Sequence, residues 1–213
     1  MKLAGLERTF GRKLNRVATN AVTARPGLWR LFRAPLRLVF DRIAATWDQG
    51  RSPTAFEALK QALAALPEAP RRVLDLGTGT GTAALLAAER FPNAEVVGAD
   101  ISEQMLAQAR EKTPPELAAR VRFEAADGSR LPFEDGAFDL AVLSNMIPFY
   151  DELARVTAPG GHVLLSFSAG PETPIWVPLE RITAELEQRG FADFAHFRPE
   201  PSVALLARKG PAV

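Results

Sequence analysis

The sequence has no cysteine and only two histidines, His162 and His196, among its 213 residues. The absence of cysteine excludes disulfide bonds, thiolate metal ligands and a cysteine nucleophile. With two histidines a His-rich zinc site is not expected either, and we predict no metal. No run of about 18 uninterrupted apolar residues occurs, so no membrane-spanning helix is expected. The composition, 47% hydrophobic and 24% charged, is typical of a globular protein, and we expect a cytoplasmic location.

Acidic residues are scarce at the start of the chain. Residues 1–51 contain eleven Lys or Arg and three Asp or Glu, a net charge of +8, and the rest carries −7. Three interpretations of this basic stretch stay open: a helical cap over a cleft, a helix on an anionic membrane surface, or a contact with nucleic acid or another protein. Nucleic acid is the least favoured, because the aromatic residues follow the apolar stripe and no recognition motif is present.

The first third of the chain has helical periodicity. Apolar residues recur at spacings of three and four over 3–17 and 29–43. Pro35 is expected in the first turn of the second helix, and a third, shorter helix follows. We predict a basic N-terminal helical extension or cap over 1–69 and a separate domain over 70–213.

From residue 71 onward, short apolar runs alternate with helical segments. The expected strands lie near 73–76, 95–99, 121–126, 138–144, 161–167, 192–197 and 202–207. Strands that alternate with helices indicate a mostly parallel sheet with helices on both faces, an α/β doubly wound fold. The last two strands have a proline-rich turn and no helix between them, so they should be antiparallel to each other.

A glycine-rich turn, Gly77-Thr78-Gly79-Thr80-Gly81, connects the first predicted strand to a helix. Glycines at such a turn tolerate positive φ and let a ligand approach the backbone. The spacing G-x-G-x-G differs from the G-x-G-x-x-G of nicotinamide enzymes. Asp75, two residues before the turn, would repel a pyrophosphate. The arrangement therefore favours a cationic ligand.

Two further acids end the next two predicted strands. Asp100 is placed to accept hydrogen bonds from the two ribose hydroxyls of an adenosine, and Asp127 from the adenine amino group. Ligands of open α/β sheets bind at the carboxyl ends of the strands. The sequence thus predicts an adenosine-containing ligand at this edge.

These residues resemble the class I S-adenosylmethionine-dependent methyltransferases, in particular the subgroup of quinone-biosynthesis and other small-molecule enzymes. The matching segments are Asp75–Gly81, Asp100, Ala126-Asp127, Phe138–Asn145 and Leu153–Gly161. The resemblance covers about residues 70–168. It implies a Rossmann-like seven-stranded sheet in the order 3-2-1-4-5-7-6, with strand 7 antiparallel. It also implies S-adenosylmethionine as the cofactor and S-adenosylhomocysteine as its product.

The resemblance also implies roles for individual residues. Glycines of the turn would line the methionine and ribose portions of the cofactor, Ile101 and Met105 would pack on adenine, and Asn145 would lie near the sulfonium methyl. The residues expected to bind the cofactor are Asp75, Gly77, Thr78, Gly79, Gly81, Asp100, Ile101, Met105, Ala126, Asp127, Gly128 and Asn145. Asn145 and Tyr150 are the candidates for a catalytic role, which otherwise stays unassigned. Trp47 and Asp48 are further candidates for closing over the cofactor.

The implied activity is methyl transfer to a small, lipophilic acceptor by in-line displacement, in which the protein mainly orients the two reactants. A general base is needed only if the acceptor must lose a proton. Three alternatives stay open: a nicotinamide-dependent oxidoreductase, a non-catalytic S-adenosylmethionine-binding protein, and a nucleic-acid methyltransferase that uses the basic arm. The expected partners are a small-molecule acceptor and, through residues 1–45, the surface of an anionic membrane; nucleic acid is not expected.

Overall fold

The computed structural model describes residues 2–49 and 52–211, with side chains from residue 12 onward. Met1, Gly50 and Arg51, which the predicted N-terminal extension includes, lie outside the described residues. No helix of the described part of the chain is long and apolar enough to cross a membrane.

Seven strands in the described residues form one sheet in the order β3-β2-β1-β4-β5-β7-β6. Neighbouring strands pair in parallel from β3 to β5, whereas β7 is antiparallel to both β5 and β6. The predicted order and the antiparallel seventh strand are therefore confirmed. The bounds are β1 (Arg72–Leu76), β2 (Glu95–Asp100), β3 (Val121–Ala125), β4 (Phe138–Ser144), β5 (Thr157–Phe167), β6 (Phe191–Phe197) and β7 (Val203–Lys209).

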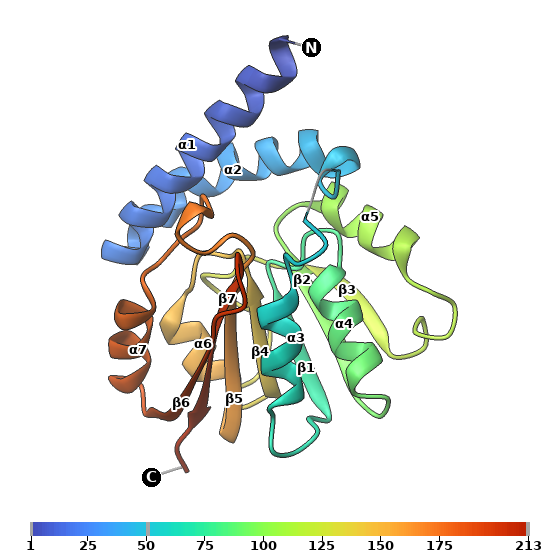
Figure 1. Cartoon of the computed structure of the whole chain (residues 1–213), viewed down its shortest axis with the longest axis vertical. Coiled ribbons are helices and arrows are strands. Elements are labelled where there is room, and N and C mark those ends of the chain that lie inside the picture. The colour runs from blue at the N-terminus through green and yellow to red at the C-terminus, as the bar shows by residue number, and fades with distance from the viewer. Residues whose placement is uncertain (1, 50–51, 212–213) are drawn as a thin grey trace.

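Helices cover both faces of this sheet (Figure 1). Successive residues of β1 alternate between the two faces, with Val73 in one apolar cluster and Leu74 in the other. The helices that share the cluster of Val73 are α3 (Glu57–Ala64), α4 (Thr82–Arg90) and α5 (Glu103–Lys112). Those that share the cluster of Leu74 are α6 (Tyr150–Val156) and α7 (Leu179–Glu187).

Because α3 packs in the main core, it belongs physically with the sheet, although it precedes residue 70. The predicted division into 1–69 and 70–213 stays a prediction.

The two remaining helices, α1 (Lys2–Ala24) and α2 (Trp29–Ile43), lie across the carboxyl ends of the parallel strands, at the top of Figure 1. A short 3-10 turn, η1 (Pro26–Leu28), joins them, and a second one, η2 (Ala44–Thr46), follows. Their buried residues form a third apolar cluster with Ile147, Phe149 and Ile175 from the sheet domain. We call residues 2–46 the helical cap.

One detail of the cap was predicted wrongly. Pro35 lies inside α2, in its second turn, because the helix already begins at Trp29. Proline there removes the hydrogen bond to the carbonyl of Leu31. Both residues are exposed, so that carbonyl can be hydrated and the helix continues.

Candidate functional site

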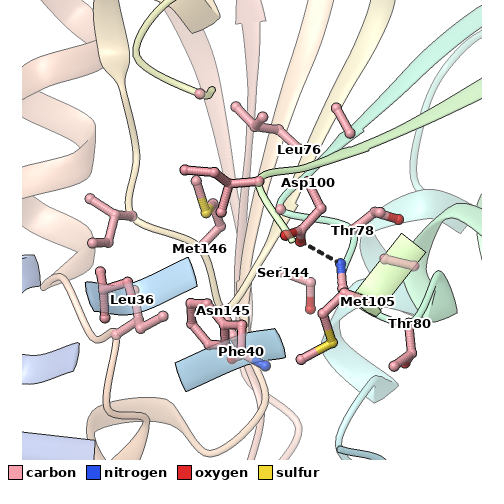
Figure 2. Close-up of a pocket in the computed structure, with 18 of the residues that line it drawn as sticks. Leu36, Phe40, Leu76, Thr78, Thr80, Asp100, Met105, Ser144, Asn145 and Met146 are labelled. Carbon is pink, nitrogen blue, oxygen red and sulfur yellow. Dashed lines mark hydrogen bonds between the residues drawn. The ribbon is translucent and has the colours of Figure 1, made fainter. Parts of the chain in front are cut away.

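A cleft opens where the cap meets the carboxyl ends of β1, β2 and β4 (Figure 2). It encloses about 900 Å³ of space outside the atoms, including its open mouth. Nine of the residues predicted to bind the cofactor line it: Gly77, Thr78, Gly79, Asp100, Ile101, Met105, Ala126, Gly128 and Asn145. The strands thus bring together residues that are far apart in the sequence.

The three glycines of the turn have backbone conformations that other residues rarely adopt. Gly77, Gly79 and Gly81 have φ angles of 71°, 53° and 83°, which are unfavourable for other residues. A Cβ atom on Gly77 would lie 2.6 Å from the Met146 sulfur, so this position is closed to side chains. Gly81 does not line the cleft; it begins α4 and packs closely against Phe123.

The N–H groups of this turn are largely used inside the protein. Gly77 and Thr78 donate to the Ala99 carbonyl at 2.8 and 3.1 Å, and Gly81 donates to the Thr78 carbonyl at 2.9 Å. A phosphate-binding turn would keep such groups directed at the ligand. The geometry therefore suits a ligand with little anionic charge better than a pyrophosphate.

Asp75 lies beneath the turn and does not line the cleft. Its Oδ2 accepts hydrogen bonds from the Thr78 hydroxyl at 2.6 Å and the Ala84 N–H at 2.9 Å. Complete burial raises the pKa of Asp75 to about 7, although both hydrogen bonds oppose the shift. Asp75 therefore anchors the turn and the start of α4, and a direct contact with a ligand in the cleft is not supported.

Asp100 is placed as predicted, at the end of β2 and on the wall of the cleft. The Gly79 N–H donates to its Oδ2 at 2.9 Å, the dashed line in Figure 2, and the Ser102 N–H donates to its Oδ1 at 2.9 Å. Burial raises the pKa of Asp100, while the Ser102 and Gly79 hydrogen bonds oppose the shift. The carboxylate is thus held in one orientation, and each oxygen retains acceptor capacity for a hydroxyl.

Asp127 does not line the cleft, although its neighbours Ala126 and Gly128 do. Its carboxylate accepts hydrogen bonds from Trp29 Nε1 at 2.6 Å and from the Ser129 N–H at 2.9 Å. Arg33 forms an ion pair with it at 3.4 Å. Burial acts to raise the pKa of Asp127, but the hydrogen bonds from Ser129, Trp29 and Arg33 lower it overall. In this structure, therefore, the carboxylate that was expected to bind the adenine amino group is bound by Trp29 and Arg33 of the cap.

The two candidate catalytic residues are separated. Asn145 lines the cleft with a positive φ of 54°. Its side chain pairs twice with Ser168, because Nδ2 donates to Oγ at 3.0 Å and Oδ1 accepts from the N–H at 2.9 Å. Tyr150 is buried at the start of α6, where it lines a different groove and lies under the Arg189 guanidinium. The structure therefore gives no support to Tyr150 as a residue that orients the acceptor.

Sequence reasoning missed most of the wall that the cap contributes. Asn15 from α1 and Trp29, Leu36 and Phe40 from α2 line the cleft, together with Trp47 just after η2. Figure 2 shows Leu36 and Asp100 on opposite sides of it. The apolar stripe of α2 was visible in the sequence as a helical face. Periodicity alone does not tell which element such a face covers.

Polar contacts tie the cap to the turns around the cleft. Asp41 accepts a hydrogen bond at 2.6 Å from the hydroxyl of Ser102, the N-cap of α5. Just beyond the cap, Asp48 accepts from the Thr80 hydroxyl at 2.9 Å and pairs with Lys112 at 2.7 Å. Together with the Trp29–Asp127 bond, these contacts hold the cap against three strand ends.

The strand order, the glycine turn and the acid at the end of β2 define the architecture of the class I methyltransferases. Residues 73–161 match the family described as a methyltransferase domain. The resemblance seen in the sequence is therefore confirmed for residues 73–161.

Among curated relatives, a demethylmenaquinone methyltransferase of Thermus thermophilus is 49% identical over 116 residues, which cover 51% of this chain and 52% of that protein. A demethylmenaquinone methyltransferase of Beutenbergia cavernae is 39% identical over 159 residues, 68% of this chain and 61% of that protein. The chain thus spans about half the length of the curated relatives that it matches.

Solved structures share the fold. An S-adenosylmethionine-dependent methyltransferase from Aquifex aeolicus superposes with a TM-score of 0.62 at 19% identity, over 78% of this chain and 97% of that one. Another, from Mesorhizobium loti, has a TM-score of 0.57 at 24% identity, over 74% and 99%.

Proposed function

We propose that this protein binds S-adenosylmethionine in the cleft and transfers its methyl group to a small apolar acceptor of the quinol type. The observation that carries the proposal is the Asp100 carboxylate, held by two backbone N–H groups beside a glycine turn whose own N–H groups are largely satisfied. Such a site accepts hydrogen bonds from a ribose and tolerates a positively charged sulfonium. The names of the curated relatives support a quinone-type acceptor.

The residues of the chain fit the parts of this cofactor. Asp100 would hold the ribose hydroxyls, Ile101 and Met105 would pack on adenine, and Gly77 and Gly79 would lie along the methionine portion. When bound, the cofactor supplies a methyl group that is activated by its sulfonium charge. Asn145, fixed by its two bonds to Ser168, would then shape the space beside that methyl group.

The role of the protein in such a transfer is to hold donor and acceptor in line and to exclude water. Orientation of this kind can contribute about 7–11 kcal/mol in favourable cases. The apolar wall of the cleft from Leu36, Phe40 and Ile175 would bury an aromatic acceptor. No proton-transferring dyad is needed if the acceptor arrives with an ionised hydroxyl or an electron-rich ring.

Turnover tests the proposal and separates it from a protein that binds the cofactor without using it. The full-length protein is incubated with S-adenosylmethionine labelled in its methyl group and with chemically reduced 2-prenyl-1,4-naphthoquinone. We expect label in the organic extract and one S-adenosylhomocysteine formed per methyl group transferred. Cofactor binding without either product would favour the non-catalytic alternative.

The basic residues of the cap make contacts within the molecule, which supports a cap over the cleft more than a contact with nucleic acid. Arg16 donates to the carbonyls of Pro171 and Thr173 at 3.1 and 3.0 Å, and Arg12 donates to that of Glu172 at 3.0 Å. Arg33 pairs with Asp127. These arginines join the cap to the loop after β5 and to the end of β3, so part of the positive charge offsets the acidic domain.

We further propose that the outer face of α2 contacts an anionic membrane. Leu31 and Leu38, seven residues apart, are 63% and 51% exposed, and the exposed Arg30 and Arg37 flank them. Each basic residue near an anionic surface contributes about 1 kcal/mol. Co-sedimentation should be stronger with phosphatidylglycerol than with phosphatidylcholine vesicles and weaker for a Leu31→Ser, Leu38→Ser variant. Equal sedimentation with both lipids would contradict this.

A further inference from the structure

The buried face of α1 carries an amide that the proposed mechanism does not use. Asn15, Ala18, Thr19 and Val22 occupy positions i, i+3, i+4 and i+7, which lie on one face of the helix, and all are buried. Ala18 and Val22 belong to the apolar cluster between the cap and the sheet domain. Asn15 lines the cleft itself and is 7% exposed.

The polar groups of this face differ in how they are satisfied. The hydroxyls of Thr19 and Thr23 donate to backbone carbonyls one turn earlier, each at 2.7 Å. The side-chain oxygen of Asn15, Oδ1, is buried and has no hydrogen-bond partner. Buried polar atoms are nearly always paired, and an unpaired one destabilises the folded protein. Because Asn15 lies on the wall of a cleft, a donor on a ligand could pair with this oxygen.

The surroundings of Asn15 restrict the chemistry of that ligand. Leu36, Phe40, Ile147 and Ile175 line the same cleft, on the side formed by the cap and the loops that it covers. The side formed by the glycine turn and Asp100 is the more polar one and would be taken by the cofactor. The remaining space is therefore mainly apolar, and Asn15 lies on its wall.

We infer that Asn15 is a specificity-determining residue that accepts a hydrogen bond from a hydroxyl group on an otherwise apolar, aromatic acceptor. This inference rests on the proposed function, because it assigns the acceptor end of the same cleft. A molecule of the same shape without a donor leaves Oδ1 unpaired in the complex. A site built to pair with a hydroxyl group rejects such an analogue.

Two matched probes test the assignment, 1-naphthol and 1-methoxynaphthalene, which differ in whether the oxygen carries a proton. Each is titrated calorimetrically into the full-length protein, with and without saturating S-adenosylhomocysteine. The wild type should bind 1-naphthol about tenfold more tightly, the cost expected for one unpaired buried acceptor. Asn15→Leu should reduce this preference to less than twofold. Asn20→Leu, an exposed position on the same helix, is the matched control and should leave it unchanged.

Thermal unfolding distinguishes this role from a purely structural one. If Asn15 only stabilised the fold, Asn15→Leu would lower the Tm. Because Asn15→Leu removes an unpaired buried oxygen, its Tm should equal or exceed that of the wild type. A lower Tm together with an unchanged preference for 1-naphthol would overturn the inference. So would a wild type that does not distinguish the two probes or binds neither.

The titrations without S-adenosylhomocysteine keep the two proposals separate. Failure of S-adenosylhomocysteine to bind would contradict the proposed function. The preference for 1-naphthol could still be compared between the wild type and Asn15→Leu in the titrations without S-adenosylhomocysteine. Normal cofactor binding with no effect of Asn15→Leu would contradict only the inference about Asn15.

Discussion

The sheet domain and the helical cap build the two sides of the cleft in different ways. On the domain side, the groups that face the cleft are fixed by the backbone: a turn with three glycines at positive φ, and Asp100 held by two N–H groups. On the cap side, the cleft is lined by side chains of two amphipathic helices, such as Leu36 and Phe40. Backbone constraints leave a recognisable signature in a sequence, whereas one apolar helix face resembles another. The domain side therefore fits a shared cofactor, and the cap side suits an acceptor particular to this protein.

The largest effect should follow a change on the domain side. Asp100→Ala removes the proposed acceptor of both ribose hydroxyls and the anchor of Gly79, so S-adenosylmethionine should bind about a hundredfold more weakly, as expected for two bonds to a charged acceptor. Calorimetric titration measures the change. Glu103→Ala, an exposed position at the start of α5, is the matched control.

Because Asp100 is also structural, Asp100→Asn is tested beside it, and both variants are compared with the wild type by thermal unfolding. Weaker binding should persist in a folded Asp100→Asn protein. Wild-type affinity in that variant would mean that the ribose lies elsewhere.

A change on the cap side should be smaller and should affect the other substrate. Phe40→Ala removes an aromatic wall of the cleft that also packs edge-on against Trp47, with ring centroids 5.8 Å apart. We expect the KM for the acceptor to rise about tenfold, consistent with the lost burial of an aromatic ring, and the Kd of S-adenosylmethionine to change less than threefold. Arg42→Ala, exposed on the same helix, should change neither constant. Equal losses for both substrates would break the proposed division between the two sides.

The smallest effect concerns the acid beneath the turn. The pKa of Asp75 in the folded protein, about 7, lies above its ordinary value of 3.8, so the folded state binds the proton more tightly. Stability from this group is therefore full below about pH 4 and is lost as the pH rises towards about 7. Between pH 5.5 and 7.0, wild-type stability should fall by about 1 kcal/mol more than that of Asp75→Asn, which cannot ionise. Urea unfolding at the two pH values checks this, and parallel curves for the two proteins would contradict it.

The fold was predictable because its signals are local. Short apolar runs marked the strands, the first three of them followed by glycine or aspartate, and the family resemblance supplied their order. Ser102, a residue type that favours the N-cap position, caps α5, and its hydroxyl accepts the Met105 N–H at 3.2 Å. Pro35 was misplaced because the start of α2 at Trp29 has no side-chain cap to mark it.

The site was predictable only where the main chain determines it. Asp100 and most of the turn line the cleft, whereas Asp75 and Asp127 do not, because their partners are set by packing. The cofactor-binding roles of all these residues stay predictions. Trp29 donates a hydrogen bond to Asp127 although it lies 98 residues away in the sequence, so no local sequence pattern predicts this contact. Asn15 could not be distinguished from any polar residue on a helix, since its unpaired oxygen is a property of the folded environment.

The most direct test of the central claim is a side-by-side calorimetric titration of the full-length protein with S-adenosylmethionine, S-adenosylhomocysteine and NADH. We predict micromolar binding of both adenosyl ligands and no binding of NADH, because the glycine turn offers a dinucleotide few free N–H groups. Binding of NADH, or no binding of either adenosyl ligand, would contradict it.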